Sequence, residues 1–148
     1  MSTITITLES PVPPEHVLSA AMDFSDRRSQ IFPAVELEHF TVHGVDDVTE
    51  GTGTGIGTSW ERCRYERSED RVIATVTDSN VYAVPGSVWE IAATPIPGGS
   101  RVEMKWVRRF RRSPRGLLFG TAFRVVGRPL FRKYAKQIVQ NLGAHERT

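Results

Sequence analysis

Apolar and polar residues alternate at the very start of the chain. Within Thr3–Leu8 every second residue is apolar, and Ile4, Ile6 and Leu8 share one side. This period of two predicts a half-buried β-strand. The prolines between positions 11 and 14 end the strand. They also suit the first turn of a following helix, because proline lacks the N–H that such a turn leaves unpaired.

Two short helices are predicted after this strand. The first carries apolar residues at helical spacing, namely Val17, Leu18, Ala21 and Met22. Asp23 or Ser25 can cap a second helix over Arg28–Ile31. Pro33 stops this second helix, since the residue before a proline is pushed away from helical geometry.

From Val35 onward the period of two returns. The predicted strands are Val35–His43, Gly57–Arg67, Arg71–Asp78, Val88–Thr94 and Arg101–Phe110, with Asn80–Val84 as a short extra one. Their short connections predict an antiparallel meander. The glycine-rich Gly51–Gly57 indicates a turn or a bent strand. It fits no G-x-G-x-x-G register and no Gly-Lys-Ser/Thr follows it, which excludes a phosphate-binding loop.

A long helix closes the chain. It is predicted to open at Ser113-Pro114, to run to about Leu142 and to end near Gly143. Its apolar residues are Leu118, Phe119, Ala122, Phe123 and Val126 before Gly127, and Phe131, Tyr134, Ala135, Ile138 and Leu142 after Pro129. The two sets point in directions about 100° apart. We therefore expect a kink at Gly127–Pro129, with the two halves of the helix facing different surroundings.

The length of 148 residues predicts a single domain, residues 1–148. No stretch holds the ~18 consecutive apolar residues that span a bilayer. Met1–Leu8 alternates and has no basic residue, unlike a signal peptide. Cys63 is the only cysteine, so neither an internal disulfide nor a cysteine-based zinc site can form. We therefore expect a reduced, cytoplasmic setting.

Charge is distributed unevenly along the chain. Residues 1–100 hold 6 Arg and 15 Asp or Glu, a balance of −9. Residues 101–148 hold 13 Lys or Arg and 2 Glu, a balance of +11. Such asymmetry fits two interpretations: the two parts pair with each other in the fold, or the basic part meets an anionic partner.

The three tryptophans are the most informative side chains. Each falls on a different predicted strand, and three indoles overfill a plain core in a small sheet unless some border a space. The candidate ligand-binding residues are therefore Trp60, Trp89, Trp106, Phe119 and Phe123, with Arg62, Arg64 and His39 as polar contacts. Arg62 and Arg64 share their alternation with Trp60, so either the tryptophan points outward or the arginines point inward. Core packing alone is the alternative.

Several other kinds of site are not expected. His39 and His43 would lie about 13 Å apart along a strand, too far to share one ion. No Gly-x-Ser-x-Gly elbow is present. Neither a metal nor a cofactor is therefore expected.

The element order resembles that of the START-like (SRPBCC) superfamily, and within it the bacterial polyketide cyclase/dehydrase-like proteins. The resemblance spans nearly the whole chain. Its motifs are the opening Ile4-Thr5-Ile6 strand, Pro13-Pro14-Glu15-His16-Val17, Asp23-Phe24, Ile31-Phe32-Pro33, Gly55-Ile56-Gly57-Thr58, Pro97-Gly98-Gly99-Ser100-Arg101-Val102 and Gly127-Arg128. It implies an α+β helix-grip fold, in which a curved antiparallel sheet of six to seven strands wraps around a long C-terminal helix, with two short helices after the first strand. It also implies a deep apolar cavity between sheet and helix.

Three functions remain open from the sequence. The first is binding of a hydrophobic small molecule, a lipid or a polyketide-like compound, in that cavity. The second is a polyketide cyclase or dehydratase, for which His39, Arg62, Arg64 and Tyr65 are the titratable candidates and none is assigned as catalytic. The third is a membrane-surface or protein-interaction module. Its basic cluster is Arg108, Arg109, Arg111, Arg112 and Arg115, just before the apolar Gly116–Phe119. Nucleic acid is not expected, because the cluster matches no known binding motif.

Overall fold

The computed structural model describes residues 2–54 and 57–146. Its core is one antiparallel sheet of seven strands in the spatial order β1-β7-β6-β5-β4-β3-β2. The strands are β1 (Ser2–Ser10), β2 (Thr41–Gly44), β3 (Asp47–Thr54), β4 (Gly57–Arg67), β5 (Arg71–Ser79), β6 (Val88–Ile96) and β7 (Gly99–Arg108). Gly55 and Ile56, which belong to one of the motifs named above, lie outside the described residues.

The first strand pairs with the last one. Ile4 lies opposite Trp106 and Ile6 opposite Met104, and all four side chains are buried. The predicted alternation in β1 is thus confirmed. The chain then crosses to the other edge of the sheet and returns strand by strand, as the short connections predicted.

Three short helical segments follow β1. They are α1 (Pro14–Ala21), α2 (Arg28–Ile31) and a 3₁₀ turn, η1 (Leu37–His39). Pro14 opens α1, and α2 ends two residues before Pro33, as predicted. The turn η1 replaces the first part of the predicted strand Val35–His43, of which only β2 forms.

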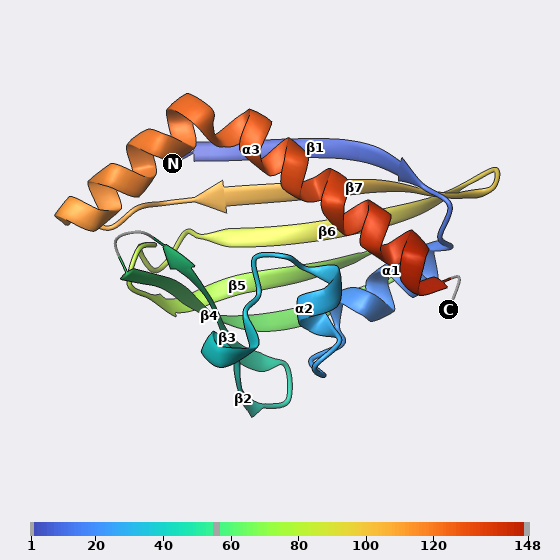
Figure 1. The fold of residues 1–148 in the computed structure, drawn as a ribbon, viewed down its shortest axis with the longest axis horizontal. Helices are drawn as coiled ribbons and strands as arrows, with labels where there is room; N and C mark the ends of the chain where they lie inside the picture. The colour runs from blue at the N-terminus through green and yellow to red at the C-terminus, as the bar shows by residue number, and fades with distance from the viewer. Residues whose placement is uncertain (1, 55–56, 147–148) are drawn as a thin grey trace.

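Helix α3 (Pro114–Glu146) passes over the same face of the sheet that α2 covers (Figure 1). Ser113 caps its start, where its hydroxyl oxygen accepts the Gly116 N–H at 3.1 Å. Pro129 lies inside the helix, and the ribbon of α3 bends between its orange first part and its red second part, in agreement with the predicted kink (Figure 1). The helix ends beyond the predicted Leu142. The side chain of Asn141 ties its second half to α2 through the carbonyl of Ile31 at 3.0 Å.

The two halves of α3 contact the sheet differently. In the second half Ala135, Ile138 and Leu142 are buried, as predicted. In the first half Phe123 is buried, but Leu118 and Val126 are about half exposed, so the predicted apolar face there is wrong. Glycines occupy the sheet-facing side instead. A Cβ on Gly127 would approach Ile4 Cδ1 to 2.9 Å and one on Gly120 would approach Phe110 to 3.2 Å, so the absence of side chains lets the helix come close.

Two local features explain why the remaining predictions differ. A Cβ on Gly51 would lie 3.0 Å from His39 Cβ, so this glycine of β3 makes room for η1. The predicted strand Asn80–Val84 is absent, apart from one isolated bridge between Tyr82 and Phe110. The Asn80 side chain bonds the backbone of β4 at Thr58 and Trp60, which holds this segment as a loop.

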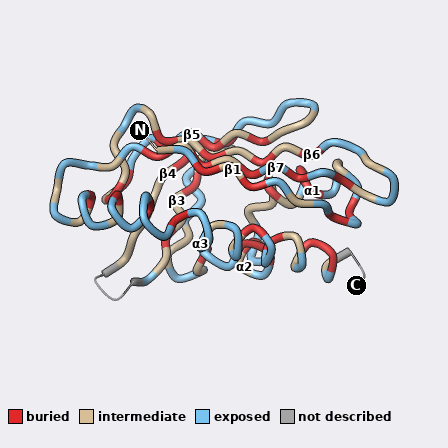
Figure 2. Tube along the Cα trace, turned by 90° about the horizontal axis from the view of Figure 1, so that it is seen from above, coloured by how far each residue is buried: buried red, intermediate tan, exposed pale blue. Residues whose placement is uncertain are grey.

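The buried residues form a layer between the sheet and the helices. Figure 2 shows them along the sheet and on the sides of α2 and α3 that face it, while the outer side of α3 is exposed. The fold is the helix-grip arrangement expected from the resemblance.

Candidate functional site

A cavity of about 170 Å³ lies between the sheet and the second half of α3. Aromatic and aliphatic side chains form most of its wall: Phe32, Val35, Trp60, Trp89, Trp106, Phe131, Tyr134 and Ile138. Polar groups also reach it, from Glu50, Thr52, Ser59, Glu61, Tyr82 and Arg108. This volume is close to that of an engineered apolar cavity of ~150 Å³ that binds benzene in another protein. The cavity, which is partly open to solvent, is therefore large enough for a small ring compound.

All three tryptophans of the chain line this cavity. Trp106 packs against Phe131 of α3 with ring centroids 4.7 Å apart. The ring centroid of Trp89 lies 6.1 Å from that of Phe32 and 6.1 Å from that of Tyr65. Trp89 therefore connects the sheet to the segment after α2. Trp89 and Trp106 therefore line the same space, whereas Trp60 borders both this cavity and a hollow on the outer face of the sheet.

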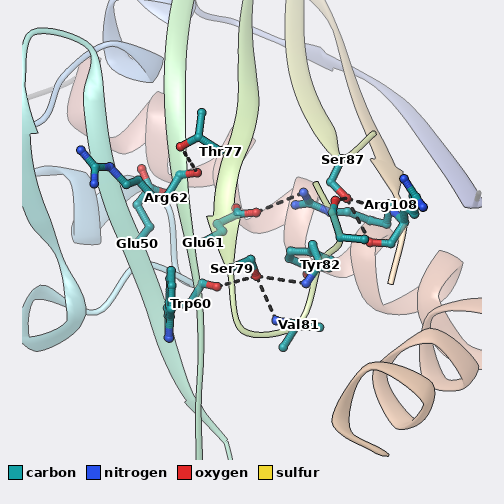
Figure 3. A network of polar contacts seen from close by, with 12 residues as sticks. Glu50, Trp60, Glu61, Arg62, Thr77, Ser79, Val81, Tyr82, Ser87 and Arg108 are labelled. Atoms are coloured by element: carbon teal, nitrogen blue, oxygen red, sulfur yellow. Dashed lines mark hydrogen bonds and ion pairs between the residues drawn. The ribbon is translucent and has the colours of Figure 1, made fainter. Parts of the chain in front are cut away.

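Arg108 at the end of β7 is buried, with 4% of its surface exposed. Its guanidinium donates to Glu61 Oε2 of β4 at 3.1 Å and lies 4.3 Å from the ring centroid of Tyr82 (Figure 3). Within residues 2–54 and 57–146, no group accepts from Arg108 Nε, although this atom is buried. Arg108 is thus a residue of the cavity wall whose buried guanidinium keeps one hydrogen-bond donor without an acceptor among the described residues. Its predicted place in the exposed basic cluster is wrong, because β7 turns it inward in register with Met104 and Trp106.

A turn after β5 holds Tyr82 in place. The hydroxyl of Ser79 donates to the Trp60 carbonyl at 2.7 Å and accepts the N–H groups of Val81 and Tyr82, each at 3.0 Å (Figure 3). This one hydroxyl connects β4 to the loop that follows β5. The Tyr82 ring consequently lies beside Arg108.

A second buried arginine lies on the other side of the cavity. Arg28 of α2 donates from Nε to Glu50 Oε1 at 2.7 Å, and its two NH groups donate to the Ala21 carbonyl at 2.9 Å and to the Tyr65 hydroxyl at 2.8 Å. Tyr65 in turn donates to Glu50 at 2.8 Å. The guanidinium also lies about 5 Å from the rings of Phe24, Phe32 and Tyr65. This arginine fastens α2 to β3 and β4.

Burial shifts the titration of several groups at the cavity. Desolvation raises the pKa of Glu61 above its usual range, and the nearby Arg108 only partly opposes this. Burial likewise raises the pKa of Tyr82 and of Tyr134. It also raises the pKa of Cys63, which keeps this inward-facing thiol protonated and unreactive. Burial therefore makes Glu61 harder to ionise than a carboxyl in water.

The other sequence-predicted site residues lie away from the cavity. Phe123 is not among the residues that line the cavity, but its ring centroid lies 5.4 Å from that of the lining residue Phe131. Phe119 is half-buried on the first half of α3. Arg62 and Arg64 point to the outer face of the sheet, where Arg62 forms a two-point ion pair with Asp47 at 2.8 and 2.9 Å. The alternation shared with Trp60 is thus resolved: the arginines point outward, and Trp60 lies at the rim.

His39 borders a shallow hollow on the outer face, together with Trp60 and Arg62. Within the described ranges, the only group of three potential metal ligands is Glu36, Glu38 and His39, whose ligand atoms lie within 4.8 Å of one another. The Glu36 carboxylate already accepts the Gly53 N–H. Exposed acidic groups of this kind are common without a metal, and nothing else there indicates one.

Glu61 and Arg108 are the functional candidates that the sequence analysis missed as cavity residues. The alternation along each strand could in part have indicated that both side chains point inward. Arg108 continues the inward series Val102, Met104 and Trp106, two residues further on. Glu61 shares the alternation of Cys63 and Tyr65, which are both buried. The signal was the pattern of burial along each strand rather than the chemistry of the side chain.

Comparison with known proteins agrees with this geometry. The sequence profile of the family described as "polyketide cyclase / dehydrase and lipid transport" matches residues 1–145. The chain belongs to this family. Its fold is one that binds hydrophobic ligands, and aromatic and aliphatic side chains form most of the cavity wall. No curated protein matches the sequence.

Solved structures share the fold at low sequence identity. A START superfamily protein from Mycobacterium smegmatis aligns with a TM-score of 0.64 at 11% identity, over 97% of this chain and 95% of that one. The Zhui aromatase/cyclase from Streptomyces sp. R1128 aligns with a TM-score of 0.67 at 11% identity, over 97% and 92%. A protein from Thermus thermophilus gives 0.65 at 14% identity, over 97% and 95%.

Within residues 2–54 and 57–146, no helix is both long enough and apolar enough to cross a membrane.

Proposed function

We propose that this protein binds a compact apolar molecule of one or two rings that carries an oxygen acceptor, such as a carbonyl group. The observation behind the proposal is the buried Nε–H of Arg108, a residue of the cavity wall, which has no acceptor among the described residues. A ligand oxygen at this point would gain a hydrogen bond to a charged donor, and the rings would fill the space beside Trp89 and Trp106. The same ligand without its oxygen would leave the donor unpaired, which disfavours it.

Two probes that differ by one oxygen test this proposal. 1-Tetralone carries a carbonyl group, and tetralin is the same bicyclic hydrocarbon without it. The three indole N–H signals in a proton–nitrogen correlation spectrum report on the cavity wall directly, since all three tryptophans lie there. We expect saturable shifts of these signals with both compounds, and binding that is tighter for the ketone by roughly tenfold or more, the effect of one hydrogen bond to a charged group.

Arg108→Met should remove the preference for the ketone while retaining binding of tetralin. Arg64→Met, which truncates an exposed arginine on the outer face of the same sheet, is the matched control and should keep the preference. Equal affinity for the two compounds in the wild type, or no saturable site, would contradict the proposal.

A second candidate function is proton transfer to and from a ketone, as a cyclase or dehydratase requires. It is favoured by the raised pKa of Glu61 next to the cationic Arg108. The Glu61 carboxylate would take a proton from the carbon beside a carbonyl, and Arg108 would donate a hydrogen bond to the enolate oxygen that results. Returning the proton to the same carbon balances the step without an added oxidant or reductant.

Exchange of the C2 protons of 1-tetralone in D₂O measures this step. We expect the wild type to accelerate exchange and Glu61→Gln to lose the acceleration, while Arg64→Met retains it. If the wild type binds the ketone but exchange is no faster than in buffer, the protein is a carrier and the catalytic candidate is wrong.

A further inference from the structure

We infer that the first half of α3 is a docking surface for an anionic lipid membrane. This segment, residues 114–130, presents large apolar side chains to solvent. Leu117, Leu118, Val125, Val126 and Leu130 are 63%, 55%, 73%, 50% and 60% exposed. Most other large apolar side chains of the described residues are buried or packed against the core, so this concentration on one half-helix needs a partner.

The exposed side of this half-helix divides into an apolar strip and a basic row. At about 100° per residue, Leu118, Ala122, Val125, Val126 and Pro129 fall within a sector about 100° wide. Arg124, Arg128 and Arg132, each four residues from the next, form the adjoining sector. The sheet-facing side is taken by the glycines at 116, 120 and 127 together with Phe123. The apolar strip therefore points away from the fold and has no partner within it.

Charge indicates what the partner is. Between Arg109 and His145 the sequence contains no Asp or Glu. Arg124, Arg128 and Arg132 are exposed and form no ion pair with any described residue, whereas Arg111 pairs with Asp78 at 3.5 Å. The cationic row is thus not neutralised by the described residues. An exposed apolar strip beside unpaired arginines fits the boundary between headgroups and acyl chains of an anionic bilayer.

A second copy of the chain fits this surface less well. Two such helices packed strip against strip would bring their arginine rows together, and like charges repel. An anionic bilayer instead offers apolar and negatively charged groups to the same half-helix. Phe131 and Tyr134 of the cavity wall follow directly after this segment, so docking would place the cavity next to the lipid.

Vesicle flotation tests the inference with the full-length protein. The probes are vesicles of phosphatidylcholine alone and of phosphatidylcholine and phosphatidylglycerol in equal parts. We expect binding to the anionic vesicles only, with loss at high salt as the charges are screened. Each exposed arginine contributes about fivefold in affinity at such a surface, so Arg124→Gln, Arg128→Gln and Arg132→Gln together should weaken binding about 100-fold.

The apolar strip is tested with Leu118→Ser and Val125→Ser, which should also abolish binding. The matched control is Val42→Ser with Val45→Ser, which removes two exposed valines at the far edge of the sheet and should leave binding intact. Arg27→Gln, Arg64→Gln and Arg101→Gln together remove three charges from exposed arginines outside α3 and are the control for the charge change.

Three results would overturn the inference: equal binding to neutral vesicles, no binding to anionic vesicles, or equal loss in the control variants. Sedimentation velocity of the protein without lipid could give a fourth result that overturns the inference. A dimer that dissociates in Leu118→Ser, Val125→Ser but persists in the triple arginine variant would assign the strip to self-association instead. Indole shifts with 1-tetralone should be unchanged in every helix variant, which separates this test from that of the cavity.

Discussion

Arg28 and Arg108 both lie buried beneath the same sheet, yet their guanidinium groups have different surroundings. Arg28 donates to Glu50, Tyr65 and the carbonyls of Ala21 and Asp23. Arg108 has one carboxylate partner, Glu61, and one buried nitrogen without an acceptor. Both pairs join elements distant in sequence: Arg28 with Glu50 links α2 to β3, and Arg108 with Glu61 links β7 to β4.

The difference shows how a buried cation can serve two purposes. A guanidinium whose three nitrogens all have acceptors, as in Arg28, contributes to the fold and has little left for a ligand. A guanidinium with a buried donor to spare costs stability, because the unpaired N–H has lost its water. Such a cost is expected at a binding site, where a ligand supplies the missing acceptor. The comparison therefore supports a structural role for Arg28 and the contact with a ligand that we propose for Arg108.

The largest expected effect is on stability at Arg28. Arg28→Met should lower the free energy of unfolding by about 3–5 kcal/mol, because it leaves the Glu50 carboxylate buried without its cation. Urea denaturation measures this. Adding Glu50→Gln should recover part of the loss, since no buried charge remains. Arg64→Met, an exposed truncation, should change stability by no more than about 0.5 kcal/mol. A similarly small change in the unfolding free energy of Arg28→Met would contradict the structural role of Arg28.

Arg108→Met should behave differently in the same assay. It deprives Glu61 of its partner, but it also removes the unpaired Nε–H, and Glu61 can become neutral. These contributions oppose each other, so we expect a loss of about 1 kcal/mol or less. A loss as large as that for Arg28→Met would mean that both arginines are structural, and the comparison would fail.

Sequence patterns predicted most of the scaffold because its signals are local. The alternation of Ile4 and Ile6, the stop at Pro33 and the kink at Pro129 each depend on a few neighbouring residues. The environment of Arg28 is not local. It lies on a four-residue helix, and its burial depends on Glu50, 22 residues away, and on Tyr65, 37 residues away. No pattern around position 28 reveals these partners.

The cavity was predicted in kind but only partly in its residues. The three tryptophans are among the residues that line a cavity, and their contact with a ligand stays a prediction. The polar residues depended on which face of β4 points inward, and a shift of one residue exchanges Arg62 for Glu61. Trp60, at the rim of the cavity, shares its alternation with Arg62 and Arg64, which wrongly suggested that these arginines could point inward. In α3, hydrophobicity favoured Leu118 and Val126 as buried residues, whereas close packing favoured glycine.

A matched pair of tyrosines sharpens the comparison between the two arginines. The Tyr65 hydroxyl joins Arg28 to Glu50, whereas Tyr82 contacts Arg108 through its ring. Tyr65→Phe should therefore cost about 1–2 kcal/mol of unfolding free energy, since it leaves buried polar groups less well partnered. Tyr82→Phe keeps the ring and should change stability by less than about 0.5 kcal/mol. The same urea titration measures both, and equal losses would show that the two networks are alike.

The smallest effect is the pH dependence contributed by Glu61. Its pKa is raised in the folded protein from the ordinary value of 4.5, so the folded state holds this proton more tightly than the unfolded chain does. The favourable contribution is present at low pH and is lost as pH rises from about 4.5 through the raised pKa. Glu61→Gln has no such proton. The unfolding free energy of the wild type relative to this variant should therefore fall over that range and then level off.

Urea titrations of the wild type and Glu61→Gln between pH 4 and pH 8 measure this difference. Removing the Arg108 charge should raise the Glu61 pKa further, so in the Arg108→Met background the fall should extend to higher pH. A relative stability that rises with pH would mean that the attraction of Arg108 outweighs the desolvation of Glu61. The ion pair with Glu61 would then be the main role of Arg108, as the ion pair with Glu50 is for Arg28. Arg108 would have little reason to bind a ligand.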